Sequence, residues 1–302
     1  MSKGTRIWLI IAASLVLIGS IVFAGAMTML HWDFSKLATD HIIENKYEVT
    51  QPFTNITVIA STADILFLPS DDETCRIAFH ESENIRHIVT VEDGTLLIQR
   101  EDTRKWYEYI GINFSKQRIT VYLPQGQYGN LAIRASTGDV TICHPYTFSE
   151  IQIALSTGDI QITDVHAETM YLSVSTGHIE ASNLVCSSIL SVFVSTGKSD
   201  LNNISCHNFS SGGGTGDVSL QNVVATGTMT VLRSTGDITL SGCDAGELII
   251  ETDTGDVNGT LLSEKMFFVH TDTGRIEVPN TNTGGRCEIT TDTGDIYIRI
   301  TD

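Results

Sequence analysis

Residues 135–142 read ASTGDVTI, and residues 155–162 read LSTGDIQI. Seven further copies of this pattern follow, and the nine central glycines are Gly138, Gly158, Gly177, Gly197, Gly216, Gly236, Gly255, Gly274 and Gly294. Successive glycines lie 19 or 20 residues apart. A regular period in this range is typical of a repeat architecture, in which each copy is one structural unit. The repeat therefore indicates the fold class before any single residue is interpreted.

The last copy contains the triplet Asp292-Thr293-Gly294, which resembles the catalytic triplet of aspartic proteases. Most copies cannot serve that chemistry, because five have Ser in place of the Asp and one has Gly214. Catalytic constellations are recognised by geometry and roles, and a pair of carboxylates needs two copies of a motif rather than nine. We therefore interpret the triplet as structural.

Apolar residues recur at fixed positions counted from each glycine, namely +2, +4 and +7 after it and −7 and −5 before it. Each repeat thus has three short apolar segments separated by turns. Stacked coils would place equivalent residues in ladders about 4.8 Å apart and fill a continuous interior. The pattern predicts an all-β fold, a single-stranded parallel β-helix (solenoid) with 19–20 residues per coil. An array of antiparallel hairpins, such as a barrel, also fits the turns but leaves the apolar +7 position unexplained.

The corner of each coil is predicted from strand alternation. Positions −3 and −1 should point inward and position −2 outward. Position −1 is Thr in all nine copies, so we expect an inward column of Thr hydroxyls. The nine glycines are predicted to be structural turns with positive φ, and the Asp common at +1 should accept turn hydrogen bonds outside.

The N-terminus has a different character. Residues 7–30 contain no charge and, as a helix, would span about 36 Å, enough for a hydrocarbon core of about 30 Å. Lys3 and Arg6 precede the segment, which predicts a cytoplasmic N-terminus and an extracellular body. A cleaved signal peptide is the alternative, since Ala24-Gly25-Ala26 fits an A-x-A cleavage site. We favour an uncleaved anchor.

These observations divide the chain into four parts. We predict a cytoplasmic N-terminus (1–6), a transmembrane helix (7–30), a linker (31–50) and an extracellular solenoid (51–302). Within the solenoid, residues 51–130 would form irregular N-terminal coils and a cap, and residues 131–302 the regular repeats.

Charge and cysteine content restrict the partners. A formal charge of −18 argues against nucleic acid or anionic lipid as the main partner of the body. The six cysteines show no C-x-x-C spacing, so neither a zinc site nor a thioredoxin-like site is expected, and no cofactor is predicted. Cys186 and Cys206 share position +9 in adjacent coils, which should place their Cα atoms close enough for a disulfide. The sequence leaves open whether they form one or stay free thiols.

The segment before the repeats reads FTNITVIASTADILFLPSDDETCRIAFH (53–80), VTVEDGTLLIQ (89–99) and ITVYLPQGQYGNLAIRASTGDVTI (119–142). This order, with Leu123-Pro124, Tyr128 and Leu131 leading into the first Ser-Thr-Gly-Asp, resembles the bacterial putative-adhesin family of exported β-solenoid proteins. The resemblance covers about residues 51–302 and implies a β-helix on the cell envelope, with no catalytic residues to carry over. Gly212 to Gly214 and Ser199 depart from the pattern and suggest a looser middle of the solenoid.

Two further segments are candidate sites. Residues 104–118 (RKWYEYIGINFSKQR) are basic and aromatic, and could touch a membrane surface or a glycan, or cap an end of the solenoid. The last coils gather Asp253, Asp256, Asp272, Asp292 and Asp295 at one corner, with Arg275 expected in the middle coil of the three. Oxygen ligands of this kind predict at most weak calcium binding; the alternative is a solvated turn edge.

The function that these features favour is non-enzymatic. We expect a membrane-anchored extracellular scaffold for adhesion or cell-envelope interaction, with a surface glycan or an envelope protein as partner. An envelope-stress or signalling accessory acting through a membrane partner is the alternative. A carbohydrate-active β-helix enzyme is less favoured, because it needs clustered acid, base and metal ligands on one face.

Overall fold

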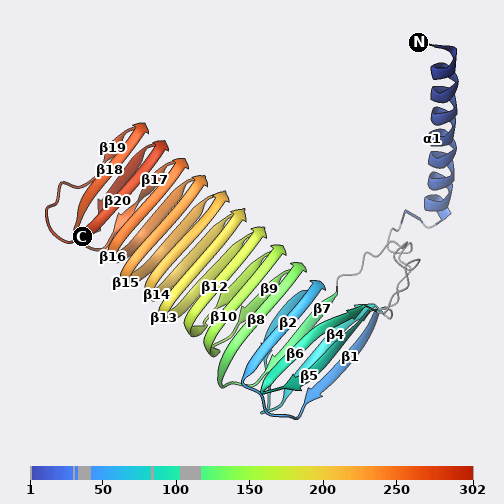
Figure 1. Cartoon of the computed structure of the whole chain (residues 1–302), viewed down its shortest axis with the longest axis horizontal. Helices are drawn as coiled ribbons and strands as arrows, with labels where there is room; N and C mark the ends of the chain where they lie inside the picture. Colours follow the sequence, from blue (N-terminus) through green and yellow to red (C-terminus); the bar gives the residue numbers. More distant parts are fainter. Residues whose placement is uncertain (1, 30, 33–41, 83–84, 103–116, 302) are drawn as a thin grey trace.

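The structure is a computed structural model and describes residues 2–29, 31–32, 42–82, 85–102 and 117–301. Its single described helix, α1 (Lys3–Met29), contains the segment predicted to span a membrane. The most apolar 18-residue stretch of Gly4–Met29 has a mean hydropathy of 2.6, so α1 is long and apolar enough to cross a bilayer, although a signal sequence would have the same properties. The remaining described chain is almost entirely β-strand (Figure 1).

The strands fall into four groups. Those of the N-terminal end are β1 (Ile42–Val49), β2 (Asn55–Thr62), β3 (Asp64–Pro69), β4 (Cys75–Ser82), β5 (Ile85–Glu92), β6 (Thr95–Asp102) and β7 (Arg118–Leu123). Long segments that precede a corner glycine are β8 (Gln127–Thr137), β10 (Thr147–Thr157), β12 (His166–Thr176), β18 (Lys265–Thr273) and β20 (Gly285–Thr293). Short segments that follow one are β9 (Val140–Cys143), β11 (Ile160–Thr163), β17 (Val257–Leu261), β19 (Ile276–Glu277) and β21 (Ile296–Ile300). Four strands run from one corner to the next: β13 (Ile179–Thr196), β14 (Ser199–Thr215), β15 (Val218–Thr235) and β16 (Ile238–Thr254).

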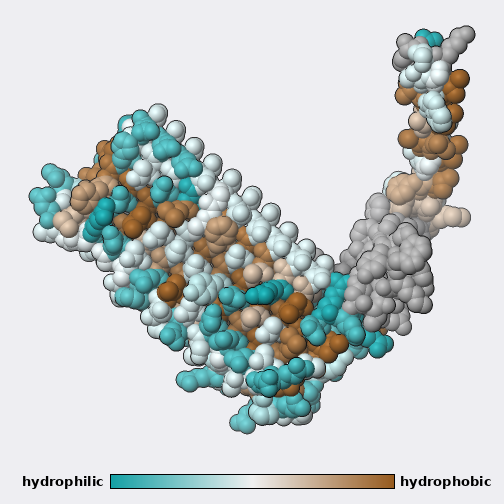
Figure 2. Space-filling model, in the orientation of Figure 1, coloured by the Kyte–Doolittle hydropathy of each residue, from teal (hydrophilic) through white to brown (hydrophobic). Residues whose placement is uncertain are grey.

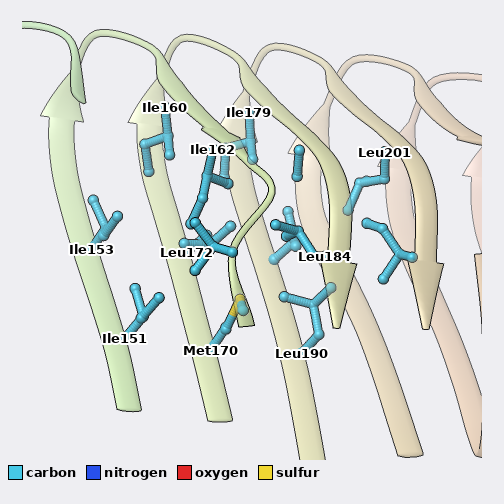
Figure 3. Close-up of a cluster of buried hydrophobic side chains, with 14 of the residues drawn as sticks. Ile151, Ile153, Ile160, Ile162, Met170, Leu172, Ile179, Leu184, Leu190 and Leu201 are labelled. Atoms are coloured by element: carbon cyan, nitrogen blue, oxygen red, sulfur yellow. The ribbon is translucent and has the colours of Figure 1, made fainter. Parts of the chain in front are cut away.

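The predicted single-stranded parallel β-helix is confirmed. Each coil from β8 to β16 pairs in parallel with the next, and equivalent residues are partners, as in Thr137, Thr157 and Thr176. The inward side chains stack along the axis and fill the interior, as Figure 3 shows for Ile153 and Leu172. The +7 column is buried as predicted from Val165 to Cys243, whereas Leu262 in that column is 50% exposed.

The corner confirms the glycine prediction and corrects the Thr prediction. Eight of the nine corner glycines have φ between 124° and 157°, where residues with a Cβ are strained; Gly274 lies outside the left-handed range. All nine Thr at −1 are exposed, so the expected inward column is wrong. Alternation ends at −3, because the backbone then turns into the corner. The hydroxyl-to-backbone role falls instead to −3, where Thr291 donates to the Gly255 carbonyl at 3.1 Å.

A second turn column at +6 was not recognised in the sequence. Asp164, Asn183, Asn203 and Asn222 all have φ near +55°, which Asn and Asp tolerate better than other side chains. Each Asn amide donates to the side-chain oxygen one coil before it, at 2.9, 3.2 and 3.0 Å. This ladder fixes the turn opposite the glycine corner.

The coils at the two ends do not stack in chain order. At the N-terminal end, β2 lies between β6 and β8, and β3 lies between β7 and β9, so the first coil of the chain is the second in space. Antiparallel strands extend this end: β5 pairs with β6, β4 with β7, and β1 with β4. Because β1 belongs to the sheet, the ordered body begins inside the segment predicted as a linker.

The C-terminal end has the same arrangement. β20 pairs with β16 on one side and β18 on the other, and β21 lies between β17 and β19. The last coil of the chain is therefore inserted under the one before it, and residues 265–277 form the outermost coil. Arg275 lies in that outermost coil rather than in the middle of the three, so the predicted stacking order of the final acids is wrong.

Candidate functional site

One face of the solenoid carries no charged side chain over four coils. It consists of the outward residues at positions −8, −6, −4 and −2, contributed by β12 to β15. They are Thr169, Tyr171, Ser173, Ser175, Ile189, Ser191, Phe193, Ser195, Asn208, Ser210, Gly212, Gly214, Thr228, Thr230, Leu232 and Ser234. We call this surface the neutral face. In a chain of charge −18, sixteen neighbouring neutral positions form a distinct surface.

The neutral face has an apolar centre among hydroxyl groups. Tyr171, Phe193 and Leu232 are 38%, 47% and 42% exposed. Gly212 lies between Phe193 and Leu232 in the stack, and a Cβ on it would lie 3.4 Å from the Phe193 ring. The Phe193 ring therefore lies beside a position that has no side chain, and no side chain projects from the surface between Phe193 and Leu232. Seryl and threonyl hydroxyls surround this centre.

Charge returns at the borders of the neutral face. Glu150 occupies the −8 position on one side, and Glu247, Glu251 and Asp253 occupy three of the four outward positions on the other. Figure 2 views this side of the molecule and shows pale and brown atoms over much of the middle coils. Sequence reasoning missed the face, although its signal was present: four columns lose every charge over the same four repeats.

Behind the neutral face lies a buried arginine. Arg233 is 3% exposed and occupies an inward −3 position. Its Nη1 donates to the carbonyls of Val194 and Gly212 at 2.8 and 3.3 Å, and its Nη2 donates to the Ser199 hydroxyl at 2.9 Å. Burial lowers the pKa of the Arg233 guanidinium from its ordinary value, and the nearby Asp217 carboxylate opposes that shift.

Arg233 explains the departures that had suggested a looser middle. A Cβ on Gly213 would overlap the guanidinium, so the glycine leaves the space that the arginine fills. Ser199, which replaces an apolar +2 residue, accepts a hydrogen bond from it. The middle of the solenoid is packed around one polar group rather than loosened.

The +1 column forms a ladder of hydrogen bonds along the corner. The side-chain Oδ1 of Asp139 accepts the backbone N–H of Asp159 at 2.9 Å, and Oδ1 of Asp159 accepts that of His178 at 2.7 Å. The ladder continues through the inserted coil, where Asp256 accepts from Asp295 and Asp295 accepts from Arg275. These acids hold the corner together across coils, which is more specific than the predicted turn bonding.

The five acids proposed as weak calcium ligands lie at one corner of three adjacent coils. Oδ1 of Asp256 and of Asp295 is already used by the ladder, and Arg275 Nη2 pairs with Asp295 Oδ2 at 3.0 Å. Across the part of the chain that the structure describes, no group of three or more His, Cys, Asp or Glu side chains is placed to hold a metal ion. Weak calcium binding remains an untested prediction with little geometric support.

The predicted adjacency of Cys186 and Cys206 is confirmed, because the two are register partners in β13 and β14. Both are buried and carry free thiols. Burial raises the pKa of both, to about 12 for Cys206, so neither is activated as a nucleophile. Of the predicted basic aromatic segment, residues 104–116 lie outside the described residues, and only Gln117 and Arg118 can be placed, at the start of β7.

Comparison with known proteins supports the fold. The sequence profile of the Toastrack DUF4097 family matches residues 53–299. No curated protein matches the chain. A crystal structure of a putative adhesin from Parabacteroides merdae is 12% identical, with a TM-score of 0.51, and the match covers 86% of this chain and 96% of that one.

Two further solved structures cover similar spans. A putative adhesin from Bacteroides fragilis is 15% identical over 87% of this chain and 99% of its own, with a TM-score of 0.48. A putative lipid binding protein from Parabacteroides distasonis is 15% identical, with a TM-score of 0.44, and the match covers 86% of this chain and 97% of that one. At these identities the likeness concerns the fold alone.

Proposed function

This chain belongs to the Toastrack DUF4097 family, and from that premise we propose that it is a membrane-anchored, non-enzymatic adhesion scaffold outside the cell. The anchor would be α1, whose predominantly apolar 26-residue span, Gly4–Met29, is long enough to cross a bilayer. The solenoid would hold a binding surface away from the membrane. The description of the Parabacteroides merdae relative as a putative adhesin is in keeping with this role.

The observation that carries the proposal is the neutral face. A partner rich in charge would find no opposite charge there, so a charged protein or anionic lipid fits poorly. Hydroxyl groups both donate and accept hydrogen bonds, which suits a ligand that is itself rich in hydroxyls. Tyr171, Phe193 and Leu232 offer apolar surface for the carbon–hydrogen faces of sugar rings. We therefore assign a neutral surface glycan as the ligand.

The test is binding of the full-length chain, held in detergent, to an array of neutral and charged oligosaccharides. We expect binding to neutral glycans and at least about tenfold weaker binding by a Phe193→Ser/Leu232→Ser variant, a loss of about 1.4 kcal/mol. Val185→Ser is the matched control, since Val185 is 44% exposed at position +8, outside the neutral face. Equal loss in both variants, binding to charged glycans alone, or capture of envelope proteins without glycan binding would refute the assignment.

A further inference from the structure

The outermost coil at the C-terminal end has an unpaired edge. β18 pairs only with β20, and β19 pairs only with β21, among the strands that the structure describes. Figure 1 shows this coil at the end of the stack opposite the N-terminal strands. An exposed strand edge presents a row of backbone N–H and C=O groups that can pair with another chain.

Apolar side chains concentrate on the same coil. Met266, Phe268 and Ile276 are 41%, 55% and 47% exposed, and Leu262, which precedes this coil, is 50% exposed. Outside α1, these are four of the eleven exposed large apolar residues that lie within the described part of the chain. Phe267, Val269 and Val278 also lie only half-buried where the core ends. Exposed apolar surface gathered in this way marks an interaction site rather than ordinary surface.

Head-to-tail stacking of copies would not continue the parallel coil at this edge. The N-terminal end of the stack is extended by the antiparallel strands β1, β4 and β5 and therefore offers a different edge. Only twelve residues, 30–41, separate α1 from β1, so an anchored chain holds its N-terminal end within about 40 Å of the membrane. The C-terminal end of such a chain is therefore the one free to face away from the membrane.

The residues of β18 are compatible with antiparallel pairing to β18 of a second copy. If two β18 strands run antiparallel around a two-fold axis at Val269, Phe267 of one copy faces Thr271 of the other, and the half-buried core residues meet. On the outward side, Phe268 faces His270 and Met266 faces Asp272. No two carboxylates and no two basic groups are directly opposite, an arrangement that would be destabilising in a sheet.

We propose that two copies of this protein pair end to end through β18, each adding its edge strand to the other solenoid. The pair joins two antiparallel molecules at their ends distant from the anchors. Copies on two facing membranes are thereby brought together, which is a homotypic contact independent of glycan binding at the neutral face. A closed two-fold pairing uses the β18 edge of both copies, so it does not propagate through β18 into a fibre.

The test is clustering of phosphatidylcholine vesicles that carry the full-length chain. We expect the wild-type protein to cluster vesicles. Two charge variants change exposed residues only: Phe268→Glu/His270→Glu and Phe268→Lys/His270→Lys. Either variant alone places like charges opposite one another and should lose clustering at least tenfold. Mixed populations place Glu opposite Lys and should cluster again, which also shows that both variants are folded.

The neutral-face variant Phe193→Ser/Leu232→Ser is the control and should cluster vesicles as the wild type does. The proposal is overturned if wild-type vesicles stay dispersed, if both charge variants cluster on their own, or if mixing them restores nothing. Loss of clustering in the neutral-face variant alone would place the contact on that face. Because this readout contains no glycan, its outcome is separate from that of the array experiment.

Discussion

At the residue scale, the structure depends on a few positions where no other side chain fits. The corner glycines combine left-handed φ values with close approach to the coil before them. Gly236 has φ 141°, and a Cβ on it would overlap the carbonyl oxygen of Gly216. Arg233 is the converse case, because it is a large polar side chain inside the solenoid. Gly213 leaves the space that it fills, and Ser199 accepts a hydrogen bond from it.

Replacing Gly236 with Val should destabilise the solenoid by at least about 1–3 kcal/mol, since both the backbone strain and the overlap with Gly216 must be relieved. Urea unfolding of the full-length protein followed by circular dichroism measures the loss. Gly126→Ala is the control. A Cβ at this position would lie 3.8 Å from its nearest neighbours, atoms of the Tyr128 ring, and no unusual φ is required. An unchanged unfolding midpoint for Gly236→Val would contradict the turn geometry.

Truncating Arg233 should also destabilise the middle coils. Arg233→Ala removes three hydrogen bonds and leaves a cavity beside Gly213, for an expected loss of about 2–4 kcal/mol. Leu232→Ala, one residue away and exposed, should cost no more than about 0.5 kcal/mol. If both variants unfold at the same denaturant concentration, Arg233 does not contribute to packing.

At the scale of the elements, the inserted strand β20 is held by a side chain that crosses it. Lys265 on β18 is 4% exposed, and its Nζ reaches Asp244 Oδ1 at 2.5 Å and the Ala245 carbonyl at 2.7 Å. Its register partner on β20 is Gly285, so no side chain obstructs the path from the outermost coil to residues beyond the inserted one. The ion pair therefore joins the coils on either side of β20.

Breaking this ion pair should loosen the end of the solenoid. Lys265→Ala leaves Asp244 without its cationic partner, and we expect a loss of about 2–4 kcal/mol, concentrated in the last coils. Hydrogen exchange should show faster exchange for residues 285–300 and little change in β13. Lys198→Ala removes only an exposed pair with Asp217 and should leave the exchange of residues 285–300 unchanged. Uniform acceleration over all coils would argue against a local role.

The corner ladder predicts how Asp295 titrates. The Arg275 backbone N–H, followed by its guanidinium, lowers the pKa of Asp295. A lowered folded pKa means that the stabilisation is complete above the unfolded value of about 3.9 and is lost as pH falls through the folded value. In an NMR titration the Asp295 midpoint should lie below that value and rise only partly in Arg275→Ala, because the backbone N–H remains. A midpoint unmoved by Arg275→Ala would show that the guanidinium contributes nothing.

At the scale of the whole molecule, the body is a rod of stacked coils with different ends. The N-terminal end is extended by antiparallel strands and connects to α1, and the C-terminal end keeps an open edge. The neutral face lies between them, so the proposed glycan contact and the proposed homotypic contact use different surfaces. A rod of this kind suits a molecule that presents binding surfaces at a distance from a membrane.

The anchor can be tested on the native protein. We expect it to fractionate with membranes and to keep α1, because the uninterrupted apolar length matches a bilayer and exceeds an ordinary signal-peptide core. Mass spectrometry of the purified protein should detect peptides from residues 7–26. An N-terminus at Met27 would show cleavage after Ala26 and would remove the membrane from the proposed function.

The sequence by itself determined the coil. A period of 19–20 residues with fixed apolar columns specifies which residues of a repeat face inward, since strand alternation and the corner glycines act within about twenty residues. It therefore predicted the parallel solenoid, the glycine turns and the register of Cys186 with Cys206. The predicted inward orientation of the Thr at position −1 was wrong, because strand alternation cannot locate the residue at which a strand bends into a corner.

The tertiary structure alone decided what happens between coils. Equivalent repeats have nearly equivalent pairing edges, so their sequences do not say which coil lies beside which, and the inserted coils at both ends could not be predicted. The Arg233 site joins Val194, Ser199 and Gly213, residues 20 to 39 positions away that meet only through stacking. The neutral face differs from these contacts, because four outward columns of the aligned repeats already lose every charge in the sequence. Contacts that run along the axis depend on the stacking order, and packing of the whole chain sets that order.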